Sequence, residues 1–176
     1  MRKSVFFNLL AIMMVFNFMG CDNGSNREDE IWLNLTSFLQ LNGTWRYPSS
    51  LTVKENGITI NTTYNNYLMT YNITENTYSF SLSGSAIMIY SGENISTKWP
   101  EIKEQQIEIM KYMEYYTFND SNYSITVINN YTQEFSVGYI QLDESFQNTG
   151  FPYQINKDGT KLKSNMNNIE VILTKQ

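Results

Sequence analysis

Short runs of residues that alternate between apolar and polar dominate the chain after residue 43. The clearest is Tyr78-Ser79-Phe80-Ser81-Leu82-Ser83, in which large apolar side chains take one set of alternate positions and serines take the other. Successive side chains of a β-strand point to opposite faces, so this period predicts a strand with one buried face. Similar runs rich in Ile, Val, Thr, Tyr and Phe occupy residues 58–64, 67–73, 86–90, 123–128, 134–141 and 169–174.

Turn-forming residues separate several of these runs. Asn56-Gly57 and Asp158-Gly159 predict hairpins, because tight hairpin turns need the positive φ that Asn, Asp and Gly tolerate. Short strands at close spacing, without helices alternating between them, predict an all-β fold. We expect an antiparallel sandwich or barrel of about eight strands in one domain, residues 31–176.

Two segments depart from the period of two. Helical spacing relates five apolar residues that stop just before Gly43, which predicts a short amphipathic helix at the start of the domain. These residues are Ile31, Trp32, Leu35, Phe38 and Leu39.

Residues 101–113 fit both a helix and a strand. Trp99-Pro100 favours a helix start, because proline suits the first helical turn. The β-branched and aromatic residues from Ile107 to Phe118 favour a strand that pairs with residues 123–128. We therefore expect a helix first and a strand from about Ile107.

The first 20 residues have the layout of an export signal. Arg2 and Lys3 precede an apolar run from Val5 to Met19, which is interrupted only by two asparagines. A membrane-spanning helix needs roughly 20 largely apolar residues, and this run is shorter. Residues 1–20 are therefore predicted to be a signal peptide.

Phe18-Met19-Gly20-Cys21 ends this segment and resembles the lipobox of bacterial lipoproteins. The resemblance implies that Cys21 becomes the first residue and carries lipid, and two or more acyl chains bind a membrane stably. The alternative is a plain secretory signal with an incidental cysteine. We expect residues 21–30 to be a lipidated cysteine and a flexible tether, and the protein to lie in the bacterial cell envelope, at the outer membrane.

Leu41-Asn42-Gly43-Thr44-Trp45 resembles the Gly-x-Trp start of lipocalin-like barrels. The resemblance implies that the tryptophan closes one end of a barrel, and residues 151–162 are similar to the penultimate hairpin of small bacterial members. Many lipocalins place an arginine over this ring, whereas this chain has no arginine after Arg46. A lysine such as Lys163 or Lys175 is the expected substitute. The alternative is that Trp45 is a core residue of another β fold.

Composition excludes several functional classes. The chain has no histidine, which removes the usual general base and a common metal ligand. Residues 21–176 carry 10 basic and 17 acidic residues, so nucleic acid is not an expected partner. We expect no enzyme activity, no metal and no cofactor. A glycosidase needs two carboxylates, and the acidic residues that could supply them are Glu101, Glu104, Glu108, Glu134, Asp143 and Glu144.

Asn156-Lys157-Asp158-Gly159 matches part of a calcium loop, but Gln154 and Asn165 occupy positions where carboxylates belong. A hairpin turn is the preferred interpretation there.

Aromatic residues are abundant, with 13 Tyr and 10 Phe. Inside a barrel they either line a pocket for a small hydrophobic ligand or fill a dry core. We expect a membrane-anchored lipoprotein that binds a small hydrophobic ligand in a cavity beside Trp45. The alternative is a surface interaction or structural protein with a filled interior. The candidate pocket residues are Trp45, Tyr47, Tyr78, Phe80, Tyr90 and Tyr139.

Overall fold

The structure, a computed structural model, describes residues 30–111, 113–136, 153–166 and 169–176. Ten strands of these residues form one sheet, in the order β1-β8-β9-β10-β2-β4-β5-β7-β6 with β3 beside β4. The all-β, antiparallel prediction is confirmed. The strands are β1 (Trp32–Asn34), β2 (Gly43–Arg46), β3 (Ser50–Glu55), β4 (Ile58–Ile73), β5 (Thr77–Gly92), β6 (Tyr115–Asn119), β7 (Ser124–Ser136), β8 (Tyr153–Asn156), β9 (Lys161–Met166) and β10 (Ile169–Lys175).

The sheet is open across the described strands. No pairing among them joins the two ends of the strand order, β1 and β6. Closure into a barrel therefore stays a prediction.

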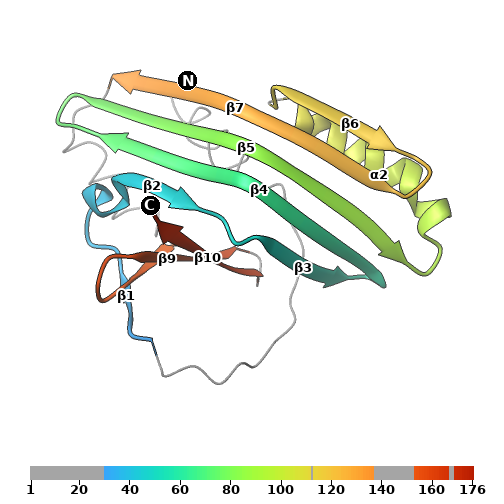
Figure 1. Cartoon of the computed structure of the whole chain (residues 1–176), viewed down its shortest axis with the longest axis horizontal. Coiled ribbons are helices and arrows are strands. Elements are labelled where there is room, and N and C mark those ends of the chain that lie inside the picture. The colour runs from blue at the N-terminus through green and yellow to red at the C-terminus, as the bar shows by residue number, and fades with distance from the viewer. Residues whose placement is uncertain (1–29, 112, 137–152, 167–168) are drawn as a thin grey trace, which may run out of the picture.

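Three long strands, β4, β5 and β7, form the larger part of the sheet (Figure 1). The predicted strands at 58–64 and 67–73 are one strand of 16 residues, and those at 78–83 and 86–90 are another. The predicted strand at 123–128 likewise continues through residues 129–133 into the predicted strand at 134–141. Residues 137–141 lie outside the described part of the chain.

A β-bulge opposite Gly84 allows β4 to continue without a break. The register of β4 against β5 shifts between Asn65 and Leu68, and Asn66 has a positive φ of 47°. Gly84 has φ +110°, and a Cβ there would lie 2.3 Å from the carbonyl oxygen of Asn66. The bulge depends on a residue without a side chain at this position, because only then can the two backbones approach.

The short strand β2 joins two layers of the structure. Trp45 on β2 is opposite Met69 of β4 on one side and Lys175 of β10 on the other. Strands β2 and β3 follow one another along β4, while β1, β9 and β10 lie below the long strands (Figure 1). The core therefore lies between the long strands and the layer of β8, β9 and β10.

The helix predicted at residues 31–39 is wrong in its extent. Trp32–Asn34 is a strand that pairs with β8, and a 3₁₀ helix, η1 (Phe38–Leu41), follows. Ser37 and Gln40 form a capping box that starts η1. Pairing with the edge of β8 therefore overrides the helical spacing of residues 31–35, whereas Phe38 and Leu41 keep the helical turn and are buried.

The helix α2 (Ile95–Met110) begins earlier and ends later than predicted. The strand expected from Ile107 begins only at Tyr115. Trp99, Gln106 and Met110 are buried at helical spacing, and the Trp99 ring contacts Tyr90 of β5 and Phe118 of β6. This stripe of buried residues packs α2 against the sheet, so the ambiguity at residues 107–110 resolves as helix. Within the described residues, no helix is long and apolar enough to cross a membrane.

Both predicted hairpins are confirmed. Asn56 and Gly57 have positive φ values of 48° and 76° and connect β3 to β4, and Asp158-Gly159 connects β8 to β9.

We predict that Gly84→Ala destabilises the domain far more than Gly57→Ala. Both positions have positive φ, but a Cβ at Gly57 would have nothing within 4 Å, whereas at Gly84 it would meet backbone at 2.3 Å. We expect G57A to lower the free energy of unfolding by about 1–2 kcal/mol and G84A to lower it by about 3 kcal/mol or more. Urea unfolding followed by circular dichroism measures both, and equal losses would contradict the role assigned to the bulge.

Candidate functional site

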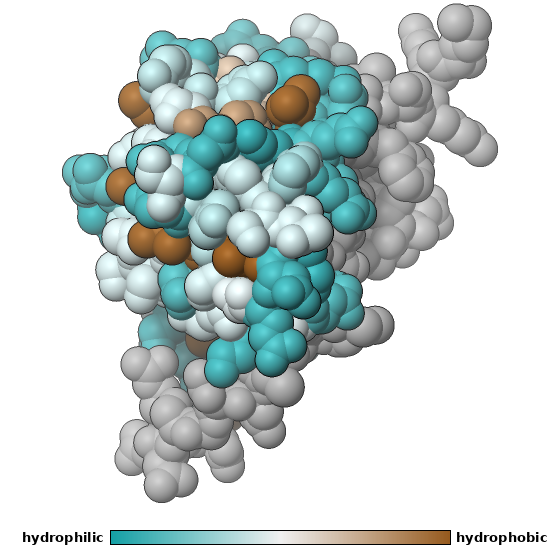
Figure 2. All heavy atoms as spheres, turned by 90° about the vertical axis from the view of Figure 1, so that its right-hand side faces the viewer, coloured by the Kyte–Doolittle hydropathy of each residue, from teal (hydrophilic) through white to brown (hydrophobic). Residues whose placement is uncertain are grey.

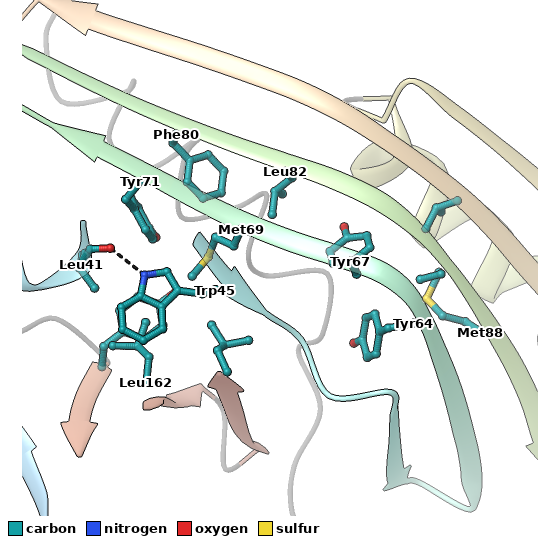
Figure 3. Packing of buried hydrophobic residues seen from close by; sticks show 14 of the residues in the cluster. Leu41, Trp45, Tyr64, Tyr67, Met69, Tyr71, Phe80, Leu82, Met88 and Leu162 are labelled. Carbon is teal, nitrogen blue, oxygen red and sulfur yellow. Dashed lines mark hydrogen bonds between the residues drawn. The ribbon is translucent and has the colours of Figure 1, made fainter. Parts of the chain in front are cut away.

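Trp45 lies in the middle of the core and has no solvent-exposed surface. Its indole Nε1–H donates a hydrogen bond of 2.7 Å to the carbonyl oxygen of Leu41, at the end of η1. Figure 3 shows its ring between Met69 and Tyr71 of the long strand β4 and Leu162 of β9. Side chains from both layers therefore surround the indole.

A lysine covers Trp45, as predicted for a chain without the lipocalin arginine. Lys175 Nζ lies 5.2 Å from the centroid of the Trp45 ring. Gly43 makes room for this side chain, because a Cβ at its φ of +121° would lie 3.0 Å from Lys175 Cε. The other candidate, Lys163, instead lies over Trp32, with Nζ 4.5 Å from that ring's centroid.

Tyr47 belongs to a group of three tyrosines beside the β4 bulge. Its ring centroid lies 5.2 Å from that of Tyr64 and 5.1 Å from that of Tyr67, which are 5.4 Å from each other. Tyr64 and Tyr67 are buried, whereas Tyr47 is partly buried. The Tyr67 hydroxyl accepts a hydrogen bond of 3.3 Å from Asn129 Nδ2.

Tyr78 and Phe80 belong to a second aromatic group along the same inner face. The ring centroid of Tyr71 lies 6.2 Å from Tyr78 and 5.1 Å from Phe80. The hydroxyl of Tyr71 is hydrogen-bonded to that of Tyr153 on β8. We call Tyr47, Tyr64, Tyr67, Tyr71, Tyr78 and Tyr153 together the tyrosine cluster.

Tyr90 is not part of this cluster. It is buried under α2, where its ring centroid lies 5.5 Å from that of Trp99. The structure thus places Trp45, Tyr78 and Phe80 in the central core, Tyr47 half-buried against it, and Tyr90 with the helix. Tyr139 and the lipidation residue Cys21 lie outside the described residues. Sequence reasoning missed Tyr64, Tyr67, Tyr71 and Tyr153, although the first three stand at alternating positions on either side of the bulge.

Burial keeps the phenols of the cluster protonated. Desolvation is the largest cause of the raised pKa of Tyr47, Tyr64, Tyr67, Tyr71, Tyr78 and Tyr153. Neighbouring tyrosines raise the pKa of Tyr47 further, and the Asn129 hydrogen bond lowers that of Tyr67 in part. These hydroxyls are neutral donors and acceptors in an apolar surrounding, which suits orienting a polar group but not acid–base catalysis near neutral pH.

The candidate carboxylates do not converge. Glu101, Glu104 and Glu108 are exposed on α2, and Glu134 is exposed on β7. Glu108 forms a salt bridge of 2.6 Å with Lys111. Asp143 and Glu144 lie outside the described residues.

The partial calcium motif is a hairpin turn. Asn156 is buried, and its Oδ1 accepts hydrogen bonds of 2.8 Å from both Thr160 N and Lys161 N. No group of three acidic, histidine or cysteine side chains suited to a metal occurs among the described residues.

The outer face of the long strands carries a small apolar group, which we call the outer patch. It consists of Ile87, Ile89, Tyr115 and Ile128, whose exposed fractions range from 42% to 54%. Tyr115 is opposite Ile128 across β6 and β7, and Ile87 is opposite Thr126, two residues from Ile128. Figure 2, which views the molecule from the right-hand side of Figure 1, shows a largely hydrophilic surface with scattered apolar residues.

We predict that stability falls as the pH rises above about 10. Burial raises the folded pKa of each cluster tyrosine above the ordinary value of 10.0. The unfolded chain therefore loses its phenol protons first, and the stability that protonation supplies is complete below that pH and lost as the pH approaches the folded pKa values. Urea unfolding across this range, with phenolate absorbance of the native chain, tests this. Phenolate absorbance at pH 10 that corresponds to half-ionisation of every tyrosine in the folded chain would contradict it, because unshifted phenols give that value.

Comparisons with protein-family models, with curated proteins and with solved structures find no match to this chain.

Proposed function

We propose that the mature chain is a lipid-anchored protein of the bacterial cell envelope, at the outer membrane, that acts through its surface. The observation that carries this proposal is the packing of the predicted pocket residues. Trp45 and Phe80 are fully buried and Tyr78 is nearly so, each against side chains of the core cluster. A core filled in this way leaves the surface as the place where a partner binds.

Anchoring at Cys21 is supported by the lipobox resemblance of residues 18–21 and by the polar residues 22–30 that follow. The single cysteine is consistent with a thiol reserved for lipid. The proposal includes no enzyme activity, no cofactor, no metal and no nucleic acid.

The outer patch supports a role for the surface. Single exposed apolar residues are ordinary, whereas adjacent ones on a sheet face are more often found where a protein is bound. The four side chains come from three neighbouring strands, so they form one surface.

A second candidate function is the binding of a small hydrophobic ligand beside the tyrosine cluster. Asn129 is buried and donates to Tyr67, and its Oδ1 has no hydrogen-bond partner among the described residues. Buried acceptors are usually satisfied, so a ligand donor is one candidate partner for this atom. The half-buried Tyr47 lies next to Tyr67.

The lipocalin-like barrel is kept as the proposed architecture of the whole domain. Its support is local: the helical turn η1, the positive φ of Gly43, the buried Trp45 and the covering Lys175. The proposed barrel is open at β1 and β6, because no pairing among the described strands joins these two edges. Hydrogen–deuterium exchange of the two edge strands tests this, and strong protection of both would indicate closure.

We predict that residues 22–176, purified natively without lipid, yield no stoichiometric small molecule on extraction with organic solvent. Mass spectrometry of the extract makes the measurement, before and after incubation with envelope lipids. The physical reason is that side chains already occupy the volume around Trp45.

A stoichiometric molecule would contradict the filled interior and favour the second candidate. The variants Tyr47→Phe and Tyr115→Phe then locate it, because each removes one hydroxyl. Loss of the molecule in Y47F alone would place it at the tyrosine cluster, whereas Tyr115 is on the outer patch.

A further inference from the structure

We propose that the edge strand β1, together with the preceding Ile31, lies against the lipid bilayer to which Cys21 is attached. This inference rests on the proposed lipid anchor and adds an orientation of the domain on the membrane. The surface concerned is Ile31, Trp32 and Leu33.

Strand β1 is an unusually apolar edge. Ile31 is 58% exposed and Leu33 is 48% exposed. Within the described sheet, β1 pairs only with β8, which leaves its other edge open. Soluble proteins usually protect such edges with charges or proline. Ile31, Trp32 and Leu33 provide neither.

Both sides of the strand carry apolar side chains. Leu33 is opposite Ile155 and shares its side of the sheet, whereas Trp32 points to the other side. Lys163 Nζ lies 4.5 Å from the centroid of the Trp32 ring. Tryptophan is suited to the boundary between lipid and water, because its ring is amphipathic.

The proposed anchor lies close to this strand in the sequence. Nine residues, 22–30, separate Cys21 from Ile31. A coil of nine residues spans about 15–20 Å, so the proposed anchor keeps β1 within about that distance of the lipid. Figure 1 shows that the start of β1 lies at the end of the molecule away from α2. The anchor holds the strand at a high effective concentration near lipid, so a weak apolar contact suffices.

The charges around β1 are paired. Lys161 forms a salt bridge of 2.9 Å with Glu30, and Lys163 lies 3.8 Å from Glu170. The contact is therefore apolar in character, and we expect it to persist at high salt. A second copy or another protein is less favoured as the occupant, because neither is held at this edge by the tether.

The experiment uses the mature lipidated chain in vesicles of phosphatidylethanolamine and phosphatidylglycerol. Cys21 is the only cysteine, so Leu33→Cys adds a single free thiol for a fluorescent label once Cys21 carries lipid. Ile89→Cys is the matched control, because Ile89 is 43% exposed on the outer patch. Lipids brominated near the headgroup end of their chains quench labels that touch the bilayer.

We expect brominated lipid to quench the label at position 33 at least about threefold more than the label at position 89, at low and at high salt. Equal, weak quenching in chains that remain on the vesicles would overturn the orientation and leave the anchor intact. Loss of the chain from the vesicles, with no lipid on the Cys21 peptide by mass spectrometry, would overturn both. Quenching at 33 that disappears at high salt would also overturn the apolar contact.

Discussion

The burial of Trp45 is the constraint on which the two layers of this fold depend. Strand β2 has only four residues, yet it pairs with β4 on one side and β10 on the other. A large ring on so short a strand supplies contact area that the few backbone hydrogen bonds cannot. The indole is fixed by its hydrogen bond to Leu41 and covered by Lys175 from the far end of the chain. One residue thus links η1, the long strands and the C-terminal hairpin.

The sequence predicted the features that depend on neighbouring residues. Alternation identified strands at residues 58–64, 67–73, 78–83 and 86–90, and Asn56-Gly57 identified the first hairpin. The lysine over Trp45 was expected because the arginine was missing, and Lys175 fills that place. Each of these follows from local backbone preference or from the chemistry of one contact.

Features that depend on distant pairing were not predictable in the same way. The continuity of β4 requires Gly84 opposite the bulge, and nothing near Asn66 in the sequence signals this partner. Residues 32–34 are a strand because β8 lies beside them, although their spacing suits a helix. Ile107 is in α2 because the helix packs its buried stripe on the sheet, where propensity alone favoured a strand.

The sequence predicted only part of the candidate site, because distant strand pairing assembles the rest. Trp45, Tyr78 and Phe80 alternate into the core as expected, but the tyrosine cluster also needs Tyr153 from β8, and the register of the sheet brings it there. Tyr90 belongs with Trp99 under α2 instead. The same packing that assembles the aromatic groups fills the interior, and this is the link between the fold and the function proposed for the surface.

The unfolding free energy of Trp45→Ala tests the filled interior most directly. If side chains surround the ring, the variant leaves a cavity and loses about 3–5 kcal/mol relative to the native chain in urea unfolding. If Trp45 instead lines an open space that a ligand occupies, the ring makes few contacts in the ligand-free chain, and its removal lowers the unfolding free energy only slightly. A loss below about 1 kcal/mol would therefore contradict the account.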